Sequence, residues 1–366
     1  MLASEFHTSV AAISLVITAS TLGVAGIAPL AGILADRWGR KRVIVPSALL
    51  LAVPSALAAT ATDVNQLVFW RFLVGVCTPG ISVVISAYIV EEWEDRVGSA
   101  LSAYVAGTVL GGFSGRLLAG LIAQRFSWRA ALAALAVLNA AGGLGVWAWL
   151  PAGRRFQREA SAASTAAAMR RHLRNPQLVA TYAVGFCVLF SMLATFTYVN
   201  FYLAAPPFGL STAALGMLFV VYLAGAAATL VAGRWIDRKG HRLVLMVAFT
   251  GSVGGILLTL LPWLPAILIG LALCCTGVFA AQSASTGYIG IVAKEARAAA
   301  VGLYVMFYYI GGSVGAAIPG RFWARGGWPA CVALIAGTQV LIIALAGFFW
   351  QPGKPLASTP IGEIAP

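Results

Sequence analysis

A thirteen-residue segment occurs twice in this chain, each time where a long apolar run changes into a basic stretch. The first copy, residues 32–44, reads GILADRWGRKRVI, and the second, residues 233–245, reads GRWIDRKGHRLVL. Five positions are identical at a constant offset of 201, and they pair Gly32 with Gly233, Asp36 with Asp237, Arg37 with Arg238, Gly39 with Gly240, and Val43 with Val244. A charged turn that recurs at equivalent places in two hydrophobic halves predicts an internally repeated membrane fold.

The composition places the chain in a lipid bilayer. Hydrophobic residues make up 60% of it and charged residues only 10%, far from the averages of soluble proteins. Apolar stretches of about 20 residues, long enough to cross the hydrocarbon core, follow one another with short polar breaks. We therefore expect an all-α membrane protein with about eleven spanning helices, over roughly residues 9–34, 43–62, 67–90, 98–123, 130–150, 178–203, 212–236, 244–261, 265–292, 298–322 and 328–350.

Lysine and arginine are distributed unevenly between the two sets of loops. Eighteen of the 24 fall in alternate loops, in the central segment and in the C-terminal tail, whereas the other loops hold four. The positive-inside rule then places both repeated turns, the central segment and the C-terminus in the cytoplasm. The net charge of +13 thus sets orientation, and no nucleic-acid partner is expected.

The two halves differ by one helix. In the second half two spans lead to the turn at Gly233, whereas in the first half only one leads to Gly32, so the chain corresponds to helices 2–12 of a twelve-helix plan. Either the true start codon lies upstream or the chain is truncated, and the sequence leaves both open. We expect an N-terminal bundle over residues 1–151, a cytoplasmic linker over 152–177, a C-terminal bundle over 178–350 and a cytoplasmic tail over 351–366. The Ala/Ser-rich linker with basic ends is compatible with an interfacial helix, and the proline-containing tail is expected to be disordered.

The first turn, with Gly32, Leu34, Asp36, Arg37, Gly39, Arg40 and Lys41, resembles the signature loop between helices 2 and 3 of the major facilitator superfamily. The strings GTVLGGFSGRLLAG at residues 107–120 and LYVMFYYIGGSVGA at residues 303–316 resemble the YnfM-type branch of efflux permeases in that superfamily. The resemblance implies two pseudo-symmetric bundles and alternating-access transport. The second copy departs from the signature at Arg234, Ile236 and His241.

The turn residues are candidates for a conformational latch. Gly32 and Gly39 allow close backbone approach and dihedral angles that a Cβ would forbid. Asp36 can pair with a neighbouring arginine or accept from the first amides of a helix. The resemblance implies that it contacts the start of the eleventh family helix, around residues 298–302, in the outward-facing state. The positive-inside rule is enough to explain a cation such as Arg42. It does not explain why Asp36 and Asp237 occupy matching positions, because acidic residues contribute little to topology. The complete candidate set is Gly32, Asp36, Arg37, Gly39, Arg40, Gly233, Asp237, Arg238 and Gly240.

Glycines recur every four residues in both halves, at Gly107, Gly111 and Gly115 and again at Gly311 and Gly315. Glycines at this spacing leave one face of a helix without side chains, so a neighbouring helix can pack closely against the backbone and can also slide along it. Equivalent steps in both halves favour a pair of sliding contacts between the bundles, although static close packing explains either step alone.

Arg71 and Arg116 are the two charged residues within predicted spans. A buried guanidinium is costly unless it is paired or hydrated, which predicts a cavity or a partner. Either arginine can bind an anionic group of a substrate or take part in proton coupling, and Arg71 can instead snorkel to the outer headgroups. All eleven acidic residues fall in loops or at helix ends, so proton coupling is implied only by the resemblance.

An aromatic, weakly polar substrate cavity is a further hypothesis, with helix packing or an interfacial aromatic belt as the alternative for each ring. Its candidate residues lie on the seventh, tenth and eleventh family helices. They are Phe190, Tyr198, Asn200, Gln282, Tyr304 and Tyr308.

The sequence contains no Walker loop, nucleophile elbow or zinc pattern, so we expect no enzyme activity, no cofactor and no metal. The hypothesis is a monomeric secondary transporter in a bacterial inner membrane that moves a small organic solute by alternating access, in the direction of efflux. The alternative is a transport-inactive truncated paralogue or a membrane sensor that keeps the fold. Substrate, direction and coupling ion are not determined by the sequence.

Overall fold

The computed structural model describes residues 5–6, 8–92, 97–151, 153, 162–294 and 297–351. These residues form helices joined by short connections, and no strand occurs among them. Ten helices in this part of the chain are long and apolar enough to cross a membrane, and the predicted span over 98–123 is a helix of 29 residues. The expected all-α membrane fold is therefore confirmed.

The N-terminal bundle follows the predicted spans, with one interruption. The span predicted over 67–90 consists of two helices that meet at Thr78, where Pro79 brings no amide N–H to the helix. The elements are α2 (Val10–Trp38), α3 (Arg40–Ala59), α4 (Val64–Cys77), α5 (Pro79–Glu92), α6 (Val97–Arg125) and α7 (Trp128–Trp149).

The C-terminal bundle follows a short helix α8 (Ala162–His172), which lies within the predicted linker. The span predicted over 212–236 is interrupted by a single 3₁₀ turn, η2 (Leu218–Val220). The other elements are α9 (Pro176–Ala204), α10 (Thr212–Met217), α11 (Val221–Lys239), α12 (His241–Leu258), α13 (Leu264–Val292), α14 (Arg297–Ala317) and α15 (Pro319–Phe349). Most of the predicted tail, residues 352–366, and linker residues 152 and 154–161 lie outside the described ranges.

The last two predicted spans are divided at two places in the structure. Helix α14 ends at Ala317, and α15 begins at Pro319, so Phe322 lies in the same element as residues 328–349. Within α15, Gly326 and Gly327 have non-helical dihedral angles, with φ of +59° at Gly327, and two helices meet there. Glycine suits a kink with positive φ, and this kink falls between residues 322 and 328, where the break between the spans was predicted.

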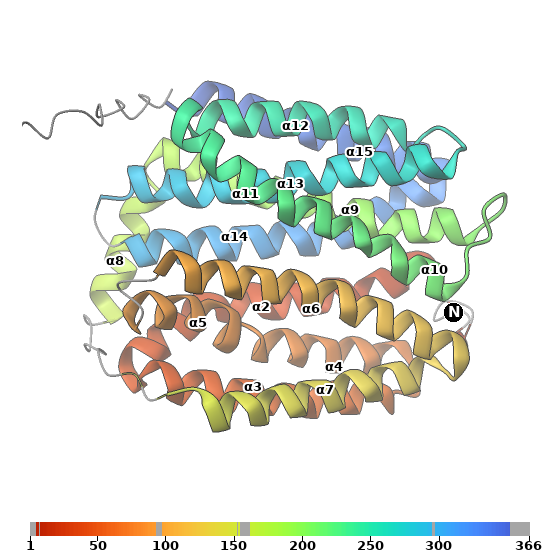
Figure 1. The fold of residues 1–366 in the computed structure, drawn as a ribbon, viewed down its shortest axis with the longest axis horizontal. Coiled ribbons are helices and arrows are strands. Elements are labelled where there is room, and N and C mark those ends of the chain that lie inside the picture. The colour runs from red at the N-terminus through yellow and green to blue at the C-terminus, as the bar shows by residue number, and fades with distance from the viewer. Residues whose placement is uncertain are drawn as a thin grey trace, which may run out of the picture.

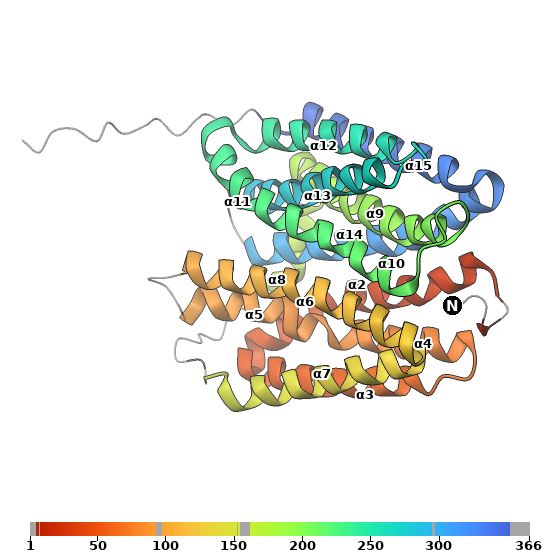
Figure 2. The ribbon, with the colours of Figure 1, turned by 45° about the vertical axis from the view of Figure 1, so that its right-hand side comes forward.

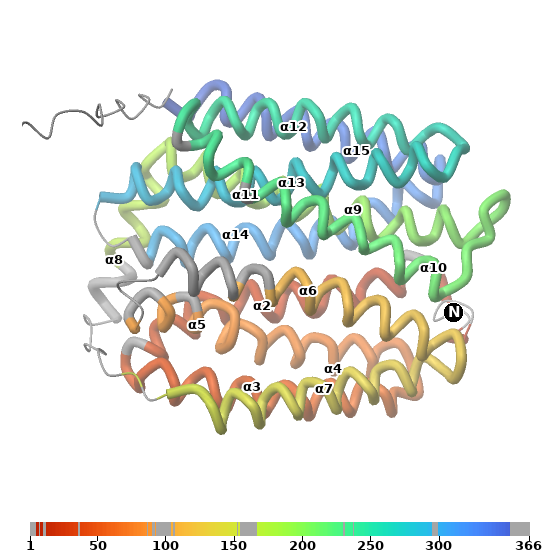
Figure 3. The backbone as a smooth tube through the Cα atoms, in the orientation of Figure 1, coloured from red at the N-terminus to blue at the C-terminus, as the bar shows by residue number. Residues whose placement is uncertain are grey.

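The two bundles lie side by side with their helices roughly parallel (Figure 1), and they remain distinct in the rotated view (Figure 2). Helices α2–α7 form one bundle and α9–α15 the other. The α2–α3 and α11–α12 turns lie at the same end of the molecule as α8, whereas the N-terminus lies at the opposite end, as the backbone trace in Figure 3 also shows. This common side for both repeated turns agrees with the charge distribution.

Large apolar side chains cover much of the outer surface. Phe348 and Trp149 are 88% and 84% exposed, which is typical of a surface that contacts lipid rather than water. The interior is also apolar, and its largest cluster lies in the C-terminal bundle around α9, α13 and α14. Helix association in this setting depends on close packing, because lipid is as apolar as the side chains.

Glycines provide that packing between α9 and α14. A Cβ on Gly311 would collide with the backbone carbonyl of Phe186, and a Cβ on Gly315 with that of Phe190. The two helices can approach this closely only without side chains at these positions. The four-residue glycine step on α14 therefore serves contact within one bundle.

We predict that Gly315→Ala destabilises the protein by about 1–3 kcal/mol, because the added methyl group forces α14 away from α9. Gly254→Ala is the matched control, since a Cβ there meets no atom of the described residues within 4 Å. It should be neutral or slightly stabilising, as expected for glycine to alanine in a helix. Thermal unfolding of both variants in detergent measures the difference, and equal midpoints would contradict the packing argument.

Candidate functional site

The two repeated turns have the same backbone geometry. In the first, α2 ends at Trp38 and Gly39 has φ of +95°, with its N–H donating to Ala35 O at 3.0 Å. In the second, Gly240 has φ of +81° and donates to Ile236 O at 2.8 Å. Positive φ of this kind is strained for residues with a Cβ, so each turn requires its glycine. The sequence repeat is thus also a structural repeat.

The remaining turn residues are glycines without close described contacts, arginines at or near the surface, and aspartates whose side chains are not described. A Cβ at Gly32 or Gly233 would meet no described atom within 4 Å, so the described residues show no close approach at Gly32. Arg37 and Arg238 are exposed, and Arg40 is partly buried at the start of α3. The side chains of Asp36 and Asp237 lie outside the described part of the structure, so the latch contact stays a prediction.

A second set of contacts ties the turn side of each bundle together. In the N-terminal bundle, Lys41 Nζ donates to Leu150 O at the end of α7, and Tyr88 Oη donates to Pro151 O at 2.9 Å. A cation at the C-terminal end of a helix is favoured by the exposed carbonyls and by the helix dipole. Lys41 thus does more than set orientation.

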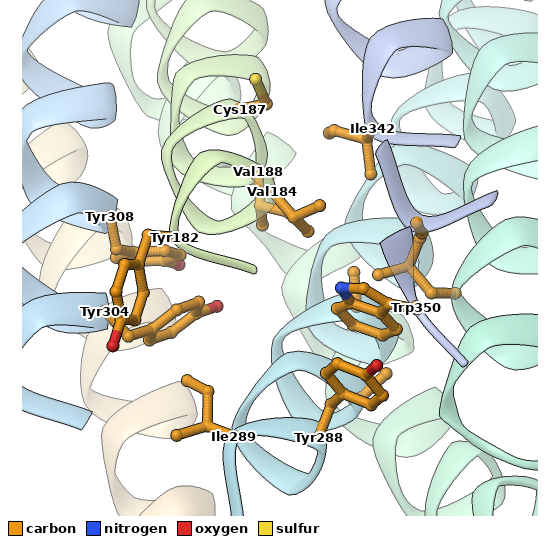
Figure 4. Packing of buried hydrophobic residues seen from close by; sticks show 14 of the residues in the cluster. Tyr182, Val184, Cys187, Val188, Tyr288, Ile289, Tyr304, Tyr308, Ile342 and Trp350 are labelled. Carbon is orange, nitrogen blue, oxygen red and sulfur yellow. The ribbon is translucent and has the colours of Figure 1, made fainter. Parts of the chain in front are cut away.

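The C-terminal bundle repeats this arrangement. Arg242 Nη1 donates to Trp350 O at 3.4 Å, and Tyr288 Oη accepts from the N–H of Gln351 at 2.9 Å. The rings of Tyr288 and Trp350 stack at 4.3 Å between centroids (Figure 4). Lys41 and Arg242 are offset by 201 residues, and Tyr88 and Tyr288 by 200. Sequence reasoning named Lys41 only as part of the turn and missed Arg242, Tyr88 and Tyr288, although the offset of 201 pairs Lys41 with Arg242.

Several polar contacts between described residues of the two bundles lie away from the turns. On α14, Ser313 Oγ donates to Thr21 Oγ1 at 2.8 Å, and Ser313 O accepts from Thr18 Oγ1 at 3.2 Å. On the other side of the bundles, Gln124 Oε1 accepts from the N–H of Ala213 at 3.0 Å. Two of the N-terminal bundle's helices, α2 and α6, therefore make these contacts with the C-terminal bundle.

The glycines that bring the bundles together are not the predicted ones. No described atom lies within 4 Å of a Cβ at Gly107 or Gly111, and Gly115 meets only Leu135 of its own bundle. Instead, a Cβ on Gly120 would lie 2.8 Å from Thr212 O, and one on Gly216 would lie 3.0 Å from Arg116 O. Hydropathy and spacing cannot show which face of α6 turns toward α10, so the pairing of Gly120 with Gly216 required the tertiary structure.

Arg116 lies at the boundary between the bundles. Its guanidinium group lies 4.7 Å from the ring centre of Phe219 and 5.2 Å from that of Tyr222. These rings belong to η2 and α11, so the interruption of the helix there accompanies the cation–π contact. Arg71 lies on α4 of the N-terminal bundle, and its Nε is shielded from solvent without a hydrogen-bond partner among the described residues.

The six predicted cavity residues divide into two groups. Tyr308 Oη donates to Gln282 Oε1 at 3.1 Å, and the rings of Tyr304 and Tyr308 lie 5.9 Å apart. Figure 4 shows these two tyrosines close to Tyr182 in the packing between α9 and α14.

The other three serve helix packing. Phe190 is buried against α14, as its contact with Gly315 shows. Tyr198 is fully buried and donates to Ala316 O at 2.9 Å. Asn200 donates to Phe196 O within α9. In this conformation, helix packing therefore accounts for the positions of these three side chains.

Comparison with known proteins identifies the family. The family model described as Major Facilitator Superfamily matches residues 1–316 and 205–364. The chain belongs to the Major Facilitator Superfamily. Both turns, the two bundles and the central segment fit this assignment, and the chain is a multi-pass membrane transporter.

Curated relatives in the superfamily cover most of the chain. It is 33% identical over 347 residues to the inner membrane transport protein YnfM of Escherichia coli, and the match spans 94% of this chain and 83% of that protein. It is 30% identical over 352 residues to the uncharacterized MFS-type transporter YybF of Bacillus subtilis, with 96% and 87% covered. Similarity to YnfM confirms the predicted resemblance.

A solved structure shows the same fold. The crystal structure of a point mutant of the nucleoside transporter NupG superposes with a TM-score of 0.75 over 96% of this chain and 93% of that chain, at 17% sequence identity. At this identity the similarity concerns the arrangement of helices in the superfamily and says nothing about the substrate.

We predict that Lys41→Met and Arg242→Met each lower the free energy of unfolding by about 1 kcal/mol, because each removes a cation from a helix C-terminus. Arg42→Met is the control, since this neighbouring arginine is exposed and carries only orientation charge in our interpretation. Thermal unfolding in detergent provides the measurement. A loss as large for Arg42→Met would show that total charge, and not the contact with α7, stabilises the bundle.

Proposed function

We propose that this protein is a secondary transporter that moves a small organic solute by alternating access, with the two bundles rocking about a site between them. The proposal rests mainly on the two turns at Gly39 and Gly240, which have nearly equal backbone geometry and lie at one end of the molecule. Contacts between the bundles away from these turns support it. Such a two-fold plan lets one site open to either side of the membrane.

The contacts favour a conformation closed on the outer side. Ser313 with Thr21, and Gly120 with Gly216, hold the bundles together there. Toward the turns, a Cβ on Gly32 or Gly302 would meet no described atom within 4 Å. The basic turns face the cytoplasm by the positive-inside rule, so these contacts fit an inward-facing state.

The relatives support the remaining parts of the proposal. A bacterial inner membrane is inferred from similarity to YnfM, and efflux from the branch resemblance. A relative described as the 3-(3-hydroxy-phenyl)propionate transporter of Escherichia coli is 26% identical over 349 residues, covering 91% of this chain and 83% of that protein. Small organic solutes are thus the size class to test first. Proton coupling rests on the resemblance, and a monomer and a cytoplasmic C-terminus complete the proposal.

Alternating access requires the outer contact between α2 and α14 to open. We predict that Thr21→Cys with Ser313→Cys, in a background in which the five native cysteines are replaced, forms a disulfide on oxidation, because the two side-chain oxygens lie 2.8 Å apart. Flux of a radiolabelled solute identified from a panel, measured in proteoliposomes, should fall to background and recover with a reductant.

Each single-cysteine variant is the control for oxidation itself. Full transport by the cross-linked protein would show that this contact does not open during the cycle, and the proposed rocking motion would then be rejected.

The latch proposal predicts that Asp36→Asn reduces flux at least about tenfold without preventing insertion, because the neutral amide weakens a charge-assisted contact with α14. Asp63→Asn removes the same charge at the outer N-cap of α4, where the carboxylate accepts from the N–H of Gln66 at 2.9 Å, and should leave flux near the parental value. Equal flux in Asp36→Asn and the parent would refute the latch.

A further inference from the structure

A groove between α6 and α7 opens on the outer surface of the N-terminal bundle. Its volume is about 360 Å³, and its walls include Leu118 and Ile122 from α6 and Ala131, Ala134 and Leu138 from α7. Every residue that lines it is apolar. Leu118 and Leu138 are 41% and 51% exposed, so the groove faces the lipid rather than the interior of the bundle.

The shape and lining of this groove suit a hydrocarbon chain. Alanine occupies three lining positions, Ala119, Ala131 and Ala134, where longer side chains would fill the space. The lining residues of α7 extend from 131 to 138, which corresponds to about 10 Å along the helix axis. An acyl chain has no hydrogen-bonding group to satisfy, whereas a polar solute would find no polar side chain in these walls.

A cation stands beyond the outer end of the groove. Figure 1 shows the connection between α6 and α7 at the same end of the molecule as the N-terminus, away from the basic turns. Arg125 follows Ile122 by three residues and Leu118 by seven, so the three residues share one face of α6. Arg125 is exposed, and the neighbouring Phe126 is 78% exposed, as is typical of an aromatic side chain at the membrane–water interface.

No described residue makes a hydrogen bond or an ion pair with the Arg125 side chain. Arg129, four residues later, is engaged with Glu5 at 3.0 Å and lies 4.3 Å from the ring centre of Trp128. Asp63, the other acidic residue of the outer loops, caps α4. The positive-inside rule does not explain Arg125 either, because it concentrates cations on the opposite side. Its charge is therefore available to an anion at the outer headgroup level.

We propose that this groove holds one acyl chain of an anionic phospholipid from the outer leaflet, with the lipid phosphate bound by Arg125. The guanidinium group matches two phosphate oxygens with parallel N–H donors. The groove alone would accept a chain of any lipid, so selection comes from Arg125. Zwitterionic lipids carry a cation next to the same phosphate, and Arg125 therefore favours headgroups with net negative charge. The inference is independent of the proposed transport function.

The test is photo-crosslinking in proteoliposomes that contain a trace of phosphatidylglycerol with a diazirine in one acyl chain. The comparison probe is phosphatidylcholine with the same labelled chain. Crosslinked sites are mapped by mass spectrometry, and only those within residues 118–138 are counted, which excludes lipids bound at the basic turns. We expect about fivefold more product from the anionic probe, the gain expected for one arginine at an anionic headgroup.

Variants separate the headgroup contact from the chain contact. Arg125→Gln should lower the yield of the anionic probe to that of the zwitterionic one, and Arg125→Lys should retain most of the preference. Arg321→Gln is the matched control, because this exposed arginine lies near the start of α15, and it should retain the full preference. Ala134→Phe fills the groove and should lower both yields. Ala133→Phe, at an exposed position outside the groove, should lower neither.

Several results would overturn the inference. These are equal yields from the two probes in the parent, a preference that survives in Arg125→Gln, and loss of the preference in Arg321→Gln, which would show that net charge selects the lipid. Absence of crosslinks within residues 118–138, or unchanged yields in Ala134→Phe, would reject the groove as the chain site. Displacement of the anionic probe by added glycerol phosphate would indicate a site for a free anion.

Gel filtration in detergent establishes the folding of each variant. Should Ala134→Phe fail to fold, Arg125→Gln, which changes an exposed side chain, still decides the question.

Discussion

Hydrocarbon offers no hydrogen bonds to a peptide group, and this constraint determines most of the structure. Every spanning segment must satisfy its own N–H and C=O groups, which only a helix does within one segment. The departures from regular helix are correspondingly short: the break before Pro79, the 3₁₀ turn over residues 218–220, and the kink at Gly326 and Gly327. The charged turns with positive φ at Gly39 and Gly240 lie beyond the helix ends, where polar groups can be hydrated.

Contacts within a bundle differ in kind from contacts between bundles. Gly311 and Gly315 place the backbone of α14 directly against α9, and the interior around them is continuous and apolar. Across the boundary, hydroxyl pairs such as Ser313 with Thr21 and the crossing of Gly120 with Gly216 make the closest contacts. Hydrogen bonds between membrane helices contribute modestly, about 1 kcal/mol each. The proposed rocking motion would have to break contacts of this kind at the boundary between the bundles.

Charge has two roles in this molecule. The bias of lysine and arginine toward one side sets topology, yet Lys41 and Arg242 also hold the ends of α7 and α15. In each bundle, one cation on the turn side thus binds the C-terminal end of the last helix. Arg71 and Arg116 are different, because they lie within the spans and lack described acidic partners. In a membrane protein such groups mark function more often than stability.

The sequence alone determined the class, the approximate spans, the common side of both turns and the superfamily, because these depend on hydropathy, charge bias and glycine geometry, which are local properties. It did not determine which helix faces meet. Gly107 and Gly111 carry the same spacing signal as Gly311 and Gly315, yet they have no close described neighbour. Similarly, Tyr198 and Tyr308 both lie in apolar helices, but the hydroxyl of Tyr198 donates a hydrogen bond to Ala316 O, whereas that of Tyr308 donates to Gln282 Oε1. Lipid and protein interior are equally apolar, so the hydrophobic pattern does not distinguish a buried face from a lipid-facing one. Only the tertiary structure, through contact between residues far apart in the chain, decided those pairings.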